Sequence, residues 1–307
     1  MTNFDKELII PNNTKVVTRL MVAGTDGQLL HAKGTLGMVV ETPADSTDAY
    51  RVQFPDGSVV SLTRQDFTIR AQYQLGEIET TQEKVDLYEY VIYRCIIGSR
   101  AYGLEHDASD TDYRGIYLPP ADLHWSLMGV PEQIESRETE EAYWELQKFL
   151  ILALKANPNI LECLYTPLVE LATPLAQELL AMRDCFLSKL IYQTYNGYVM
   201  GQFKQLERDL RTSGDIKWKH AMHLIRLLIS GVTALQEGFI MVRQDAHRDA
   251  LLAIRSGEMP WEKVNAWRLA LHQEFDAAYK TTRLPERPDT ARVNAFLLRA
   301  RRSMVTG

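Results

Sequence analysis

The chain has 307 residues, with 40 acidic against 34 basic side chains and a formal net charge of −6. This length accommodates two or three domains. The negative balance excludes a general basic field for nonspecific binding of nucleic acid, although it leaves room for a local basic groove.

The cysteines and the hydropathy pattern exclude several further classes. Cys95, Cys163 and Cys185 form no Cys-x-x-Cys pair, so we expect neither a zinc cluster nor a disulfide framework. The amino terminus shows no cationic segment followed by an apolar core, and no apolar run approaches the ~20 residues that span a bilayer. We therefore expect a cytoplasmic protein without a membrane partner.

From residue 15 to about residue 73 the pattern is typical of short β-strands. Residues 50–54 alternate apolar and polar side chains, which is the period of a half-buried strand. Pro55-Asp56-Gly57 predicts a hairpin turn, because proline presets φ and glycine accepts the left-handed conformation. With the glycine-rich segment 34–40, this hairpin resembles an SH3-type fold. We expect a small SH3-like β-barrel over residues 1–76, which would bind a peptide or nucleic acid or support its neighbour.

The most informative motif begins where the apolar run 90–97 ends in Gly98-Ser99. Small residues at the end of a strand let the backbone approach a polyphosphate closely, and a helix that starts there directs free amide groups at the anion. Ser99 adds a hydroxyl donor, and Arg100 adds a positive charge. These residues suit the binding of a nucleoside triphosphate.

Two aspartates follow the small residues after a spacer, in Asp110-Thr111-Asp112. Because side chains alternate faces along a strand, Asp110 and Asp112 would share one face. Two such carboxylates can bind a pair of divalent ions, and magnesium is commonly held by a few carboxylates together with substrate phosphates. The alternative is a solvated loop followed by an exposed strand.

The remainder of the chain is predominantly helical. Apolar positions at helical spacing predict helices over residues 144–154, 191–210 and 217–237. On the last of these, Lys219, His223 and Arg226 are spaced at i, i+4 and i+7, so they would share one face. Next to the aspartates, this face would bind a triphosphate or an RNA phosphate. The alternative is structural, with the histidine bonded to a neighbouring carbonyl and the cations in water.

The Gly-Ser pair, the spacer and Asp-x-Asp together resemble the signature of the DNA polymerase β-type nucleotidyltransferase superfamily. The wider context is similar to the predicted nucleotidyltransferases linked to RNA repair operons, the RlaP-type family. Five segments carry this similarity, which runs from about residue 85 to about residue 292: residues 98–103, 109–117, 148–149, 155–159 and 219–228.

The resemblance implies an α+β fold. A polymerase β-type nucleotidyltransferase sheet with helices would occupy residues 83–174, and a helical domain would follow over residues 175–307. It also implies that Gly98 and Ser99 hold the β- and γ-phosphates and that Asp110 and Asp112 ligate Mg²⁺ or Mn²⁺.

Members of the superfamily usually have a third carboxylate on a following strand, where it ligates metal and helps to activate the acceptor hydroxyl. We match this position to Glu140, within an expected strand over residues 138–143. Glu138 and Glu141 are the alternatives. The acidic stretch would also suit the solvated start of a helix, where negative charge is favourable.

The implied reaction is metal-dependent nucleotidyl transfer. An acceptor hydroxyl attacks the α-phosphorus of a nucleoside triphosphate, and pyrophosphate leaves. An RNA 3′ end, such as that of a tRNA, fits the operon association, whereas a protein side chain that receives AMP or a small molecule would use the same core. A nucleotide-binding sensor or interaction module without turnover is the alternative from another class. No motif predicts the base preference or the oligomeric state.

Overall fold

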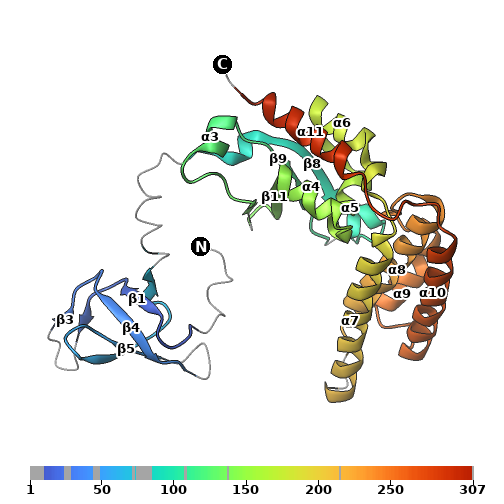
Figure 1. Cartoon of the computed structure of the whole chain (residues 1–307). Helices are drawn as coiled ribbons and strands as arrows, with labels where there is room; N and C mark the ends of the chain where they lie inside the picture. The colour runs from blue at the N-terminus through green and yellow to red at the C-terminus, as the bar shows by residue number, and fades with distance from the viewer. Residues whose placement is uncertain are drawn as a thin grey trace. The chain divides into compact units, whose positions relative to one another are not determined.

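A computed structural model describes residues 10–23, 29–43, 49–70, 73, 85–106, 109–136, 138–213 and 216–305. The chain divides into two compact units, Met1–Val85 and Asp86–Gly307 (Figure 1). Strands make up most of the regular structure described in the first unit, whereas the second combines a sheet with many helices, so the fold is α+β. The expected border near residue 174 lies inside the second unit and stays a prediction.

Seven short strands are described in the first unit. Their bounds are β1 (Lys15–Thr18), β2 (Val22–Ala23), β3 (Leu29–His31), β4 (Leu36–Glu41), β5 (Tyr50–Gln53), β6 (Val59–Leu62) and β7 (Phe67–Ile69). Five of them form an antiparallel sheet in the order β6-β5-β4-β1-β7, and β2 pairs with β3 alone. Within the described part of this unit, β6 and β7 do not pair, so the sheet is open and the SH3-like barrel is not confirmed.

The hairpin between β5 and β6 is as predicted. Tyr50 and Val52 are fully buried while the residues between and after them are exposed, which is the alternation of a half-buried strand. At the turn, Gly57 has a φ of 88°, and Asp56 accepts hydrogen bonds from the amide and the hydroxyl of Ser58. The local sequence therefore determines this turn.

The second unit is built on a mixed five-stranded sheet in the order β10-β11-β9-β8-β12. The bounds are β8 (Val91–Ile97), β9 (Asp112–Tyr117), β10 (Gln133–Ser136), β11 (Glu141–Glu145) and β12 (Val169–Ala172). The central strands β9 and β11 run parallel, and every other pairing is antiparallel. The motif Gly98-Ser99 to Asp110-Thr111-Asp112 lies between the end of β8 and the start of β9.

Ten α-helices are described in this unit. Their bounds are α2 (Ser99–Tyr102), α3 (Ala121–Trp125), α4 (Leu146–Leu154), α5 (Pro158–Tyr165), α6 (Pro174–Ala181), α7 (Leu190–Ser213), α8 (Trp218–Glu237), α9 (Arg248–Arg255), α10 (Trp261–Thr281) and α11 (Thr290–Arg302). The helices expected over residues 191–210 and 217–237 are confirmed as α7 and α8. The helix expected from residue 144 begins two residues later, because β11 continues to Glu145.

The two faces of the sheet differ in their cover. Tyr93, Cys95 and Ile116 share one face and belong to the main core with side chains of α4 and α5. The opposite face carries a small cluster that includes Tyr117 and Tyr143. Because Asp112 pairs with Ile97 in the same ladder, it lies on the helix-covered face.

Helix α8 is the centre of a bundle with α7, α9 and α10 at one end of the second unit (Figure 1). Every residue from Leu224 to Leu235 is buried. Gly231 permits this close packing, because a Cβ atom there would lie 3.1 Å from ring atoms of both Phe275 and Tyr195. Helix α11 packs against α4. In the described ranges, no helix combines the length and the apolar character needed to cross a membrane.

Candidate active site

The candidate site forms where β8 ends and β9 begins. Ile97 pairs with Asp112, so the next residue, Gly98, lies beside the Asp112 side chain. Gly98 has φ 75° and ψ −155°, a conformation that is essentially restricted to glycine. A Cβ atom at this position would also lie 2.7 Å from Asp112 Oδ2. Both the backbone and the neighbouring carboxylate therefore require glycine here.

The short helix α2 follows Gly98 directly, beginning at Ser99. Arg100 on this helix is exposed, and its Nη2 donates to the carbonyl oxygen of Ser109 at 3.0 Å. Its guanidinium thus contacts the backbone of the residue before Asp110. Arg100 is not among the residues that line the cavity described below.

The two aspartates lie on different kinds of backbone. Strand β9 begins at Asp112, whereas Asp110 belongs to the preceding loop, so the expectation that both lie on one strand is wrong. They nevertheless line the same cavity. Arg114 lies on the same strand face as Asp112, with its Nη2 3.4 Å from Asp112 Oδ1, and offsets part of the negative charge.

Glu140 is held beside these residues by its backbone. It occupies the turn before β11 with a φ of 53°, and its carbonyl oxygen accepts from the Tyr113 amide at 3.1 Å and from Arg114 Nη1 at 2.9 Å. Strand β11 pairs Glu141 with Tyr113 in parallel, which places Glu140 level with Asp112. Glu140 lines the same cavity as the aspartates.

The two alternative glutamates lie elsewhere. Glu138 is exposed in the turn and does not line the cavity. Glu141 Oε2 accepts from the Tyr143 hydroxyl at 2.9 Å and lies 3.8 Å from Arg94 Nη2. Of the three glutamates, Glu140 alone borders the cavity. The strand expected over residues 138–143 is observed instead at Glu141–Glu145.

The cavity has a volume of about 840 Å³, within the usual range for small-molecule sites. Its lining combines acidic side chains with basic and imidazole side chains. We call Asp110, Asp112 and Glu140, at the edge of the sheet, the acidic wall. We call the residues at and after the start of α8, Lys217, Lys219, His220 and His223, the basic wall. His106 and Arg255 also line the cavity, next to the loop of Asp110. Gly98 and Ser99 also line this cavity, which therefore brings together most of the residues predicted from the sequence.

The predicted set on α8 divides into two environments. Lys219 and His223 line the cavity, whereas Arg226 is fully buried beneath it. Arg226 Nη1 donates to Glu162 Oε1 at 2.6 Å, and its Cζ lies 3.6 Å from the centre of the Tyr102 ring. Burial disfavours the charge of Arg226, but the Glu162 carboxylate outweighs this effect and raises the pKa of the guanidinium. Arg226 is thus a cation of the core.

The two histidines of α8 that line the cavity have lowered pKa values. Burial, together with the electrostatic effect of Arg226 and smaller effects of His220 and Lys219, lowers the pKa of His223 to about 3. Burial and Lys217 also lower the pKa of His220. His223 is therefore a neutral imidazole at physiological pH, while Lys217 and Lys219 provide cationic charge on this wall.

Several cavity residues were missed by the sequence analysis. Lys217 and His220 had a usable signal, because they lie within one or two helical turns of His223. Arg255 had none, because it comes from α9 and reaches back to the motif loop. Its Nη1 donates to the carbonyl oxygen of Leu104 at 2.9 Å, and its Nη2 lies 2.8 Å from His106 Nε2.

The acidic wall is the part of the cavity whose side chains could contribute ligands to a metal ion. Asp110, Asp112 and Glu140 offer the oxygen ligands that Mg²⁺ and Mn²⁺ prefer. They do not form a closed coordination set, since no group of three or more His, Cys, Asp or Glu side chains in the described ranges is arranged to hold an ion. Hard cations of this kind commonly complete their coordination with substrate phosphates and water.

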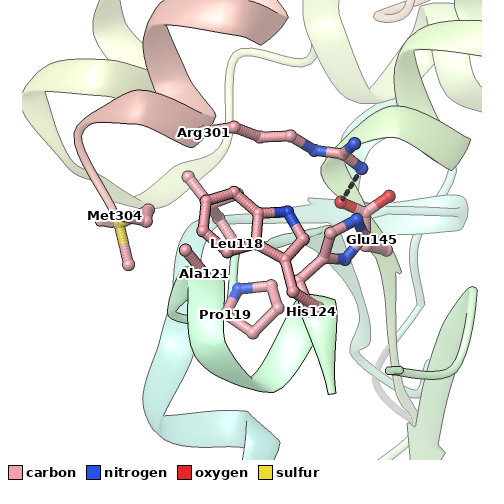
Figure 2. Close-up of a pocket in the computed structure, with 8 residues that line it drawn as sticks. Leu118, Pro119, Ala121, His124, Glu145, Arg301 and Met304 are labelled. Atoms are coloured by element: carbon pink, nitrogen blue, oxygen red, sulfur yellow. Dashed lines mark hydrogen bonds and ion pairs between the residues drawn. The ribbon is translucent and has the colours of Figure 1, made fainter. Parts of the chain in front are cut away.

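A second cavity lies near the other end of β9 and has a structural rather than a binding role (Figure 2). Its volume is about 10 Å³, which leaves no room for a substrate. Arg301 of α11 reaches into it, with Nη2 3.2 Å from Glu145 Oε1. Glu145 Oε2 in turn accepts from the Gln147 amide and caps α4. This contact attaches α11 to the sheet.

A family model and a curated relative match parts of the chain. The family model described as "RNA repair pathway DNA polymerase beta family", RlaP, matches residues 68–299. "Uncharacterized protein YcgL" of Bacillus subtilis (strain 168) is 35% identical over 82 residues, which cover 26% of this chain and 32% of the relative. The chain thus matches about a third of the length of this curated relative. No solved structure matches the chain significantly.

Proposed function

The chain belongs to the RNA repair pathway DNA polymerase beta family, RlaP, and from this premise we propose that it is a metal-dependent nucleotidyltransferase. It moves a nucleoside monophosphate from a nucleoside triphosphate to an acceptor hydroxyl and releases pyrophosphate. The bond from the α-phosphorus to the bridging oxygen of the pyrophosphate breaks, and a bond to the acceptor oxygen forms.

The observation that carries this proposal is the presence of both acidic and basic side chains in the lining of one cavity. The acidic wall, Asp110, Asp112 and Glu140, suits divalent cations, and Lys217 and Lys219 on the other wall suit an anion. A triphosphate with its divalent cation carries both charges in one ligand. An uncharged substrate would make use of neither group of charged side chains.

Each group in the cavity has a task in this reaction. Asp110, Asp112 and Glu140 would hold Mg²⁺ or Mn²⁺, which when bound offsets the charge of the phosphates. The backbone at Gly98 and the hydroxyl of Ser99 hold the terminal phosphates.

The remaining groups act on the acceptor hydroxyl and on the departing pyrophosphate. The Glu140 carboxylate accepts the proton of the acceptor hydroxyl. Lys217 and Lys219 stabilise the charge of the departing pyrophosphate, since both line the cavity that also contains the three carboxylates.

For the acceptor we propose an RNA 3′ end, such as that of a tRNA. The support is the description of the family as part of an RNA repair pathway. A protein hydroxyl or a small molecule would react by the same chemistry, and each is an outcome of the test below. Arg100 contributes by holding the loop before Asp110 rather than by contact with the nucleotide.

The test is transfer of label from each α-³²P nucleoside triphosphate in the presence of Mg²⁺ or Mn²⁺. A tRNA pool, a protein mixture or no acceptor is added, and pyrophosphate release is measured in parallel. We expect labelled tRNA with the unaltered protein and with Glu138→Gln, which alters an exposed carboxylate outside the cavity. Asp112→Asn should lose transfer while keeping its fold. Nucleotide binding without transfer to any acceptor would show a sensor, and no binding would refute the proposal.

A further inference from the structure

A buried network links the phosphate motif to α8. The Glu162 carboxylate on α5 is fully buried. Its Oε2 accepts from the Tyr102 hydroxyl at 2.7 Å, and its Oε1 accepts from Arg226 Nη1 at 2.6 Å. Tyr102 belongs to α2, the helix that starts after Gly98. One carboxylate therefore connects α2, which carries the phosphate motif, to the helix behind the basic wall.

The second amino group of Arg226 determines the state of His223. Arg226 Nη2 lies 3.2 Å from His223 Nδ1. A guanidinium only donates hydrogen bonds, so Nδ1 must offer its lone pair. A neutral imidazole carries a single ring hydrogen, which must then lie on Nε2. Protonation of Nδ1 would direct an N–H group at the guanidinium, and this agrees with the low pKa of His223.

The free nitrogen of His223 faces the cavity. His223 lines the cavity from α8. Its Nε2 is absent from the buried polar atoms that lack a partner within the described ranges, and its only hydrogen bond there is made by Nδ1. An accessible Nε2–H group therefore projects from the same wall as Lys219, where a phosphate would lie.

We propose that the buried Glu162–Arg226 pair holds His223 in the neutral Nε2–H tautomer, as a permanent hydrogen-bond donor to a phosphate oxygen of the nucleotide. Glu162 and Arg226 are positioning residues, because neither reaches the cavity. His223 contacts the substrate but takes no proton from it, since its lone pair is occupied by Arg226. The identity of the ligand rests on the proposed function, whereas the tautomer does not.

The tautomer is tested directly by ¹H–¹⁵N correlation spectra of the full chain labelled at histidine nitrogens. The His223 signals are assigned by their loss in His223→Gln. We expect an unprotonated Nδ1 and a protonated Nε2 at pH 7. A protonated Nδ1, or an imidazolium at this pH, would overturn the proposal. In Arg226→Met we expect a mixture of the two tautomers.

The donor role is tested by calorimetric binding of a non-hydrolysable ATP analogue with Mg²⁺. His223→Asn retains a polar group near Nδ1 but removes the donor at the Nε2 position, so we expect about tenfold weaker binding, the usual cost of a lost hydrogen bond to a charged group. His223→Gln extends an amide to the Nε2 position and should recover most of the affinity. Unchanged binding in His223→Asn would contradict the donor role.

The two proposals fail in different ways. If the unaltered protein binds no nucleotide, the proposed function and the phosphate ligand are both refuted, while the spectra still decide the tautomer. If the unaltered protein binds and transfers nucleotide but His223 shows the other tautomer, only the inference about His223 fails. In Arg226→Met and Glu162→Gln, we expect KM for the triphosphate to rise more than kcat falls, because these residues act through His223.

Discussion

An oxygen of the Asp112 carboxylate lies 2.7 Å from the position that a Cβ atom on Gly98 would occupy. Gly98 directly follows the end of β8, and Asp112 begins the neighbouring strand β9. The pairing of the two strands therefore brings these two residues together. The Asp112 carboxylate, which we assign to metal binding, can occupy its position because Gly98 has no side chain.

We expect Gly98→Ala to lower nucleotidyl transfer by about 100-fold, because the added methyl group displaces the Asp112 carboxylate. Left-handed backbone strain should also cost about 1–3 kcal/mol of stability. Gly238→Ala is the matched control, since Gly238 has a φ of 77° with no atom within 4 Å of the added Cβ. The control should lose stability but keep its specific activity. Equal activity in both variants would show that Asp112 is not displaced.

Glu140→Gln should lower kcat by about 10²–10⁴-fold, the usual effect of losing a general base. Glu141→Gln is the comparison, because Glu141 contacts Tyr143 and Arg94 rather than the cavity. It should retain most of the activity. Single-turnover rates of pyrophosphate release at saturating nucleotide measure the difference. The reverse order of activities would assign the third carboxylate to Glu141.

Gly115→Ala should prevent the second unit from folding or destabilise it by more than about 4 kcal/mol. A Cβ atom at Gly115 would lie 1.9 Å from the Tyr93 carbonyl oxygen, so β8 and β9 could not pair. Gly197→Ala in α7 meets no atom within 4 Å and should stabilise the protein by about 0.5–1 kcal/mol, because alanine favours helix. Thermal unfolding followed by circular dichroism measures both changes.

His223 should make the folded state less stable in mild acid. Its pKa is lowered to about 3 in the folded protein, whereas an unfolded chain protonates histidine near pH 6.5. Below that value the unfolded state binds an additional proton, so this residue removes about 1.4 kcal/mol of stability per pH unit as the pH falls. The loss ends near pH 3, where both states are protonated.

Urea unfolding between pH 7 and pH 5 tests this effect. The slope of unfolding free energy against pH should be smaller in His223→Gln than in the unaltered protein, because glutamine does not titrate. Identical slopes would mean that the folded protein binds the proton at His223 as readily as the unfolded chain does.

Local patterns predicted the long helices and the motif well. Helices α7 and α8 follow from apolar side chains at helical spacing over about twenty residues, a pattern that a β-strand or loop does not produce. The hairpin at Gly57 follows from turn chemistry. Gly98 and Asp112 meet because a strand end and a strand start adjoin in an antiparallel pair.

The remaining features depend on contacts between distant segments. The spacing of Lys219, His223 and Arg226 placed all three on one face of α8. At Arg226, however, other helices cover α8. The first two residues of this face therefore line the cavity, and the third lies in the core. The choice among three glutamates depends on the turn at Glu140, and its positive φ has no sequence signal. The pairing that would close the first sheet into a barrel is likewise a long-range property.

The contact of Arg301 with Glu145 spans 156 positions of the chain (Figure 2). Glu145 ends the strand that follows Glu140 and caps α4, and its carboxylate is nearly buried. During translation, the Glu145 carboxylate cannot pair with Arg301 until α11 has left the ribosome. The sheet of the second unit is therefore completed late, and a nascent chain interrupted before Thr290 would carry Asp110, Asp112 and Glu140 without the contact that attaches the neighbouring strand to α11.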